Sequence, residues 1–130
     1  MTYYFSTTLE LPFDAAVDKV TAALQEQQFG VLTTIDVSET LKKKLDVDFP
    51  RYVILGACNP AMAHSALLAE NKIGTMLPCN VIVRDVGDDR TEVAAVDPVS
   101  SMQAVGNKDL EDVATNVQAK LRNVIQSLGQ

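Results

Sequence analysis

Apolar and polar residues alternate along this chain in blocks whose spacing predicts strands and helices in turn. Residues 2–10 are rich in Tyr, Phe and Thr and predict a first strand. In residues 13–28 the apolar positions fall three and four residues apart, which predicts a helix that Pro12 can open and Gly30 can cap. Residues 31–37 are rich in β-branched side chains and predict a second strand.

The middle of the chain predicts two shorter helices on either side of a buried strand. Ser38 is the expected N-cap of the first helix, in which Leu41 and Leu45 lie one turn apart and face inward. Residues 52–57 form a short apolar run that is typical of a well-buried strand. Residues 60–71 predict the second helix, opened by a proline. Its expected buried residues are Ala63, Leu67 and Leu68.

The last third of the chain predicts a hairpin followed by the longest helix. Residues 81–83 and 92–96 predict two strands joined by the turn Gly87-Asp88-Asp89-Arg90. Asn107 or a neighbour is the expected cap of the final helix, whose apolar residues recur at helical spacing. The order β-α-β-(α)-β-α-β-β-α predicts one α+β domain over residues 1–130, with a mainly antiparallel sheet and helices packed on one face in two layers.

Strand direction then predicts that several polar and thiol residues meet at one end of the sheet. Cys58 follows the end of the third strand and Cys79 precedes the fourth, so an antiparallel pair places both at the same end. With the hairpin turn centred near Asp88, residue 79 falls opposite Asp97. His64, the single histidine, lies early on the connecting helix. The candidate ligand-binding residues are therefore Cys58, Asn59, His64, Cys79, Asn80 and Asp97.

Composition and charge narrow the classes of function. The formal net charge is −6 and the basic residues form no stripe, which disfavours a nucleic-acid partner. The N-terminus has no signal-peptide pattern, and no apolar run approaches the roughly 18–20 residues that span a bilayer. We therefore expect a cytoplasmic protein without a membrane partner. Because aromatic residues are only 5% and Trp is absent, we expect an aliphatic core.

The candidate residues allow three interpretations. The first is binding or sensing of a small molecule or soft metal ion, with Met62, Met76 and Met102 as an adaptable apolar wall. The second is thiol chemistry, either redox or nucleophilic, with His64 as the base. The third is a non-catalytic homodimeric scaffold in which the motifs are structural.

Zinc and enzyme signatures are weak. Two Cys, His64 and Asp97 would suit zinc chemically, but their spacing matches no standard zinc pattern, so we assign no metal ligands. The chain has no Gly-rich phosphate loop, nucleophile elbow or H-E-x-x-H motif, and neither cysteine lies in a C-x-x-C motif. The sequence thus leans against an enzyme and identifies no cofactor.

Three short runs carry a resemblance to a known family. They are residues 52–60 (YVILGACNP), 77–81 (LPCNV) and 96–98 (VDP), and the similarity extends over nearly the whole chain. In these runs the chain resembles domain-of-unknown-function family 302. The resemblance implies a TATA-binding-protein-like β-α-β4-α fold of bacteria and archaea, and it implies homodimers. It implies no activity, so the function stays open.

Overall fold

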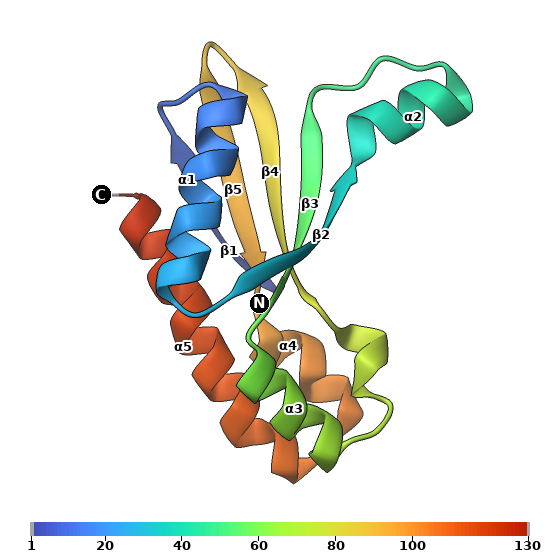
Figure 1. The fold of residues 1–130 in the computed structure, drawn as a ribbon, viewed down its shortest axis with the longest axis vertical. Coiled ribbons are helices and arrows are strands. Elements are labelled where there is room, and N and C mark those ends of the chain that lie inside the picture. The colour runs from blue at the N-terminus through green and yellow to red at the C-terminus, as the bar shows by residue number, and fades with distance from the viewer. Residues whose placement is uncertain (1, 130) are drawn as a thin grey trace.

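Five antiparallel strands form one sheet in the order β1-β5-β4-β3-β2 (Figure 1). The structure is a computed structural model that describes residues 2–129. Every neighbouring pair in the sheet is antiparallel, as the strand pattern predicts. The strands are Tyr4–Leu9 (β1), Gly30–Asp36 (β2), Tyr52–Cys58 (β3), Cys79–Gly87 (β4) and Arg90–Val96 (β5).

The helices occupy three places around this sheet (Figure 1). Helices α1 and α5 lie on one face, whereas α3 and α4 form a layer at one end of the sheet, called here the end layer. Helix α2 projects from the opposite end. The α-helices are Phe13–Glu26 (α1), Val37–Leu45 (α2), Pro60–Ala69 (α3), Pro98–Met102 (α4) and Glu111–Leu128 (α5), and short 3-10 turns cover Ile73–Met76 (η1), Gln103–Val105 (η2) and Lys108–Leu110 (η3).

The main core lies between the sheet and the two helices that cover it. Alternate residues of β3, β4 and β5 point toward α1 and α5, and Val81, Val83 and Val93 have no exposed surface. Leu24 of α1 and Leu121 of α5 are equally buried. Burying one such side chain contributes about 1.5–3 kcal/mol. Because most of the buried apolar residues lie between the sheet and these two helices, this core supplies most of the apolar stabilisation. The core is largely aliphatic, as the composition predicts.

A second, smaller cluster joins the end layer to the N-terminal part of α5. It contains Ile73 of η1, Met102 of α4 and Ala114 of α5. Because this cluster is separate from the main core, the boundary between them falls at the ends of β3 and β4. Three of the candidate residues, Cys58, Asn59 and Cys79, lie at this boundary.

The predicted order of elements and the hairpin register are both confirmed. Val81 pairs with Ala95, so continuing the register by two residues puts Cys79 opposite Asp97. The order β-α-β4-α with additional short helices matches the expected fold. The sequence pattern missed α4, a helix of 5 residues that starts directly after the hairpin.

Two predicted helix caps are wrong. Gly30 begins β2, and the C-cap of α1 is instead Gln27, which is followed by Gln28 with a left-handed φ of 69°. Asp36, rather than Ser38, caps α2: its carboxylate accepts hydrogen bonds from the Glu39 backbone N–H at 2.9 Å and from the Ser38 hydroxyl at 2.8 Å. The carboxylate is the stronger acceptor at the positive end of a helix, and it stands one turn before Glu39.

The predicted buried faces of α2 and α3 are also wrong. Leu45 of α2 is 65% exposed and this helix buries no residue, because it extends beyond the edge of the sheet. In α3, Leu67 and Leu68 are exposed, whereas Ala66 is buried. The spacing of apolar residues shows which of them share a side of a helix, but it does not show which element that side packs against. Helix α3 packs against α5, and its one buried residue is the small Ala66.

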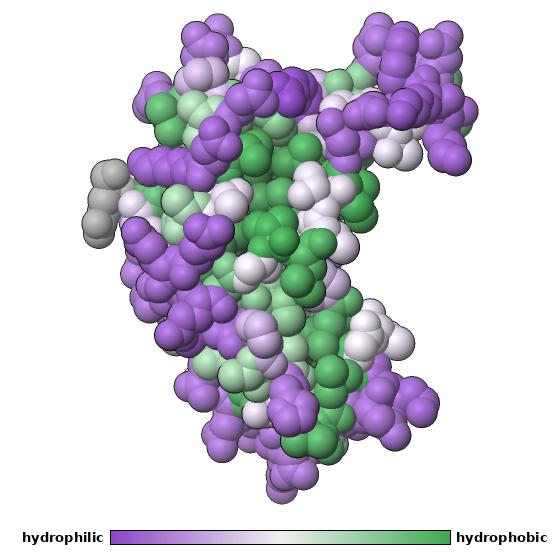
Figure 2. Space-filling model, viewed as in Figure 1, coloured by the Kyte–Doolittle hydropathy of each residue, from purple (hydrophilic) through white to green (hydrophobic). Residues whose placement is uncertain are grey.

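The surface is hollowed between α2 and the end layer. Figure 2 shows this concave edge with apolar residues, in green, along its wall. Leu32 and Ile35 of β2 are 66% and 51% exposed. None of the helices between residues 2 and 129 has the length and apolar character to cross a membrane.

We predict that Gly56→Ala destabilises the fold, whereas Gly30→Ala does not. A methyl group on Gly56 would overlap the Thr33 hydroxyl and come within 2.7 Å of Pro78 Cγ, but Gly30 has nothing within 4 Å of an added Cβ. The expected loss in unfolding free energy is about 1–3 kcal/mol for Gly56→Ala and within about 0.5 kcal/mol for Gly30→Ala. Denaturant titration measures both free energies of unfolding. Equal losses would show that the close approach of Thr33 and Pro78 to Gly56 does not exclude a side chain there.

Candidate functional site

The site begins where β3 passes directly into α3. Cys58 is the last residue of the strand, and Asn59 is the N-cap of the helix. The Asn59 side-chain oxygen accepts a hydrogen bond from the Met62 backbone N–H at 3.3 Å, and Pro60 supplies the first helical turn. The cap fixes the direction of α3, and so it places the residues of the first turn of α3 beside the end of the sheet.

Cys79 is the first residue of β4 and pairs with Ala57 of β3. The chain reaches it through a cis Leu77–Pro78 peptide bond. Burial raises the pKa of the Cys79 thiol from 9.0 to about 11, and the nearby Cys58 thiol adds a smaller increase. Cys79 is therefore a neutral thiol at physiological pH, held among apolar side chains.

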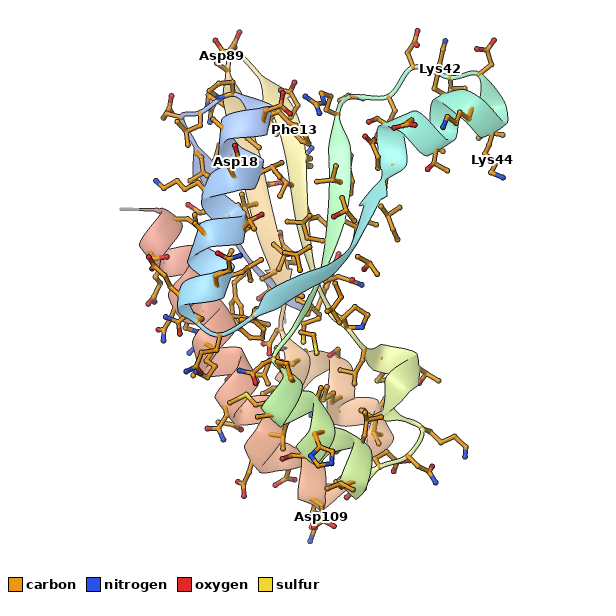
Figure 3. The ribbon with its side chains drawn as sticks, viewed as in Figure 1. Phe13, Asp18, Lys42, Lys44, Asp89 and Asp109 are labelled. Carbon is orange, nitrogen blue, oxygen red and sulfur yellow. The ribbon has the colours of Figure 1, made fainter. Side chains whose placement is uncertain are left out.

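A small cavity of about 30 Å³ lies between the sheet end and the end layer. Both cysteines and Asn59 line it, together with Met62 and Met102. In Figure 3 yellow sulfur atoms are visible where the sheet meets α3 and α4, far from Lys42 and Lys44 on the projecting α2. The remaining lining side chains are apolar, including Phe29, Ala66 and Val117. The cavity is thus rich in sulfur and poor in hydrogen-bonding groups.

An open groove of about 280 Å³ runs along the other side of Cys79. Asn80 and Ser101 provide polar groups in this groove, and Met76 lies in its wall. Its walls share four residues with the small cavity: Leu77, Pro78, Cys79 and Met102. The two spaces therefore adjoin each other.

Asp97 lies opposite Cys79 in the hairpin, but its side chain serves the fold. The carboxylate accepts hydrogen bonds from the Val99 backbone N–H at 3.0 Å, from the Ser100 hydroxyl at 3.4 Å and from Gln118 Nε2 at 3.0 Å. It therefore caps α4 and ties that helix to α5, and it lines neither the cavity nor the groove. Asp97 thus lies near Cys79, as the hairpin register predicts, but these donors engage its carboxylate.

His64 is also outside the pocket. It is exposed on α3 and lines neither the cavity nor the groove, because Met62 and Ala63 occupy the side of the helix that faces inward. Within residues 2–129 no three His, Cys, Asp or Glu side chains are close enough to hold a metal ion. A zinc site made of both cysteines with His64 and Asp97 is thus contradicted by their placement.

The structure therefore divides the predicted residues into groups. Cys58, Asn59 and Cys79 share the cavity, and Cys79 and Asn80 share the groove. The sequence pattern already indicated the wall residues Met62 and Met102. It missed Phe29, which follows α1 and carries no local signal of a distant contact, as well as Val113 and Val117, which the helical stripe marked only as buried.

Comparison with known proteins identifies the family. A family model described as a domain of unknown function, DUF302, matches residues 5–128. A solved structure of an uncharacterized conserved DUF302 protein from Bacillus stearothermophilus superposes with a TM-score of 0.88 and 23% sequence identity, over 97% of this chain and 98% of that chain. At this identity the likeness shows a shared fold. No curated protein matches the chain. Because the family model spans nearly the whole sequence, the chain belongs to the DUF302 family, whose function is unknown.

Proposed function

We propose that this protein binds, and thereby senses, a small molecule or soft metal ion at the end of its sheet. The observation that carries the proposal is the position of Cys79, which lines both the small cavity and the groove. A ligand that enters the groove meets this wall first. A modest movement of the shared side chains then joins the two spaces into one pocket.

The composition of the combined space suits a small, mostly apolar ligand. Binding sites are commonly apolar clefts of about 300–1,000 Å³ with a few polar groups that fix orientation. The groove, at about 280 Å³, is near the lower end of that range. Asn80 is exposed at the groove and Ser101 is partly buried there, so both can orient a ligand whose apolar part reaches Cys79.

Ligand binding at this position would be transmitted to the helices. The cavity walls come from the ends of β3 and β4 and from α3, α4 and α5. Asp97 already links α4 to α5 through Gln118. A ligand that fills the cavity therefore adds contacts to several elements at once and stabilises their packing in proportion to its affinity.

We predict that a bound ligand shifts the 13C-methyl NMR signals of Met62 and Met102, because both side chains line the cavity. Indole, benzene, hexanol and silver(I) ion are suitable probes, each titrated into methyl-labelled protein. Ala63→Leu should abolish the shifts, since Ala63 also lines the cavity and the larger side chain occupies it.

The matched control is Ala61→Leu, the same substitution on the exposed side of the same helix. It should leave the ligand-induced shifts intact. The proposal is contradicted by a panel in which no probe moves either methyl signal, or by a response that survives in Ala63→Leu.

The thiol-chemistry alternative is disfavoured by the raised pKa of Cys79. A reactive cysteine needs its thiolate, but burial holds this pKa at about 11. His64, the base that such chemistry would use, is exposed and lies outside the cavity lining. Cys79 therefore has neither the lowered pKa nor the neighbouring base that activates a cysteine nucleophile.

We predict that Cys79 resists alkylation in the folded protein. In Cys58→Ser, iodoacetamide should modify native Cys79 at about pH 8 at least about a hundredfold more slowly than the same thiol in denaturant. The native rate should rise with pH until the thiolate is fully formed above about 11. Mass spectrometry measures the rates, and equal rates in both states would restore the thiol-chemistry interpretation.

A second candidate function is a homodimeric scaffold, and the uncovered face of the sheet favours it. On this face Ile35, Ile54, Ile82 and Ala94 pair in one row across four strands. Helices α1 and α5 pack on the opposite face of the sheet and leave this face uncovered (Figure 1). An aliphatic row on an unpartnered sheet is the kind of surface that a second copy buries in a self-complementary dimer.

The projecting α2 and the loop that follows it also favour a partner. Helix α2 has 9 residues and buries none of them, and Leu45, Val47 and Phe49 are exposed. An isolated helix of this length is marginal in water, so contact with a second copy would stabilise it. The surface hollow between α2 and the end layer gives such a partner room to pack (Figure 2).

We predict that the protein dimerises and that Ile54→Lys weakens the dimer at least about thirtyfold, the equivalent of about 2 kcal/mol. The lysine would carry a charge into the centre of the aliphatic row. Leu68→Lys is the control, because Leu68 is 76% exposed on α3 and away from this row. Analytical ultracentrifugation measures both, and a wild-type monomer across the micromolar range would exclude the dimer.

A further inference from the structure

Four sulfur-containing residues from four separate elements line the small cavity. Cys58 ends β3, Met62 lies in the first turn of α3, Cys79 begins β4 and Met102 ends α4. These residues are far apart in sequence, and only the tertiary structure places them around one space. Cys79 and Met102 are 8% and 7% exposed, whereas Cys58 and Met62 are partly buried, so two of the four sulfur-containing side chains are buried.

The size of the cavity limits what it holds. A void needs only about 10–15 Å³ of this kind of volume to hold a water molecule. The cavity by itself, at about 30 Å³, therefore accommodates one or two atoms of that size, whereas an organic molecule also needs the space of the adjoining groove. Water is a poor occupant, because it needs two or more polar partners and the lining is almost entirely apolar.

The chemistry of the lining selects one class of occupant. Thiolate and thioether sulfurs are soft ligands that prefer Cu(I), whereas Mg²⁺ and Ca²⁺ need oxygen ligands. Zinc sites use Cys, His and carboxylate ligands, and no three such residues converge within residues 2–129. A monovalent ion with one thiolate is neutral overall, which lowers the cost of placing charge in an apolar site.

We propose that this cavity binds one soft monovalent metal ion of the Cu(I) class, with the sulfurs of Cys58, Cys79, Met62 and Met102 as its ligands. The inference rests on the proposed ligand-binding function and names its ligand class. Binding replaces the S–H bond of one of the two thiols by an S–metal bond and releases that proton to solvent, while the second cysteine coordinates as a neutral thiol, so that the site stays neutral overall. The ion keeps its oxidation state throughout.

The open groove supplies an entry path for the ion. Met76 is 39% exposed in the groove wall, and the groove reaches Cys79 and Met102, which also line the cavity. Met76 does not line the cavity, so it is not among the proposed ligands.

The test is an anaerobic competition for Cu(I) against the chromophoric chelator bicinchoninic acid. The wild-type protein should withdraw one ion per chain. Cys79→Ala should lower the affinity at least about a hundredfold, and the double variant Met62→Leu, Met102→Leu at least about tenfold. Leucine conserves the volume and apolar character of methionine, so the double variant removes two sulfur ligands with little effect on packing.

Met76→Leu is the matched control and should keep the wild-type affinity within about twofold, as expected for a residue outside the set of ligands. The proposal is overturned if no one-to-one complex forms, or if the double leucine variant binds as tightly as the wild type. Binding of silver(I) that leaves the Met62 and Met102 methyl signals unmoved also overturns it, because the ion is then elsewhere.

Failure of this inference is distinguishable from failure of the proposed function. If indole, benzene or hexanol moves the two methionine signals and Cu(I) does not bind, the pocket binds a small molecule and the metal assignment is wrong. If neither class of probe moves them, the sheet end is not a ligand site at all.

Discussion

The antiparallel pairing of β3 with β4 is the constraint on which the rest of this molecule depends. It aligns Ala57 with Cys79, so that the end of one strand and the start of the next lie side by side. Everything between these residues, α3 and η1 included, must then form at the same end of the sheet. The pairing requires a close approach at Gly56, where Thr33 and Pro78 leave no room for a side chain.

The same pairing explains why the sheet end has a chemical character of its own. The main core is filled by aliphatic side chains between the sheet and its two covering helices, and the smaller cluster belongs to the end layer. The small cavity lies where these two clusters meet, because residues of both line it. The sulfur side chains lie at this junction, and methionine is well suited to fill an irregular space. Low polarity there keeps Cys79 neutral, since a thiolate would lose its hydration without gaining a charged partner.

The two proposed functions draw on different parts of the molecule and are compatible. The sulfur-lined pocket is at the sheet end, whereas the aliphatic row of Ile35, Ile54 and Ile82 lies on the uncovered face. Asn80 borders both, because it lines the groove and a hollow on that face. A partner seated on the open face would therefore touch a residue of the ligand pocket, which would couple dimerisation to ligand binding.

The sequence by itself determined the order of the elements, the antiparallel hairpin with Cys79 opposite Asp97, and the meeting of Cys58 with Cys79 at one sheet end. These features follow from the local spacing of apolar residues and from strand direction, both of which can be inferred from the sequence. Side-chain direction was decided only by the tertiary structure. Asp97 turned to the N–H groups of α4 and to Gln118, His64 turned to solvent, and Phe29 entered the cavity from a distant loop. Each outcome depends on which elements pack against which, and contacts between residues far apart in sequence leave no periodic signal.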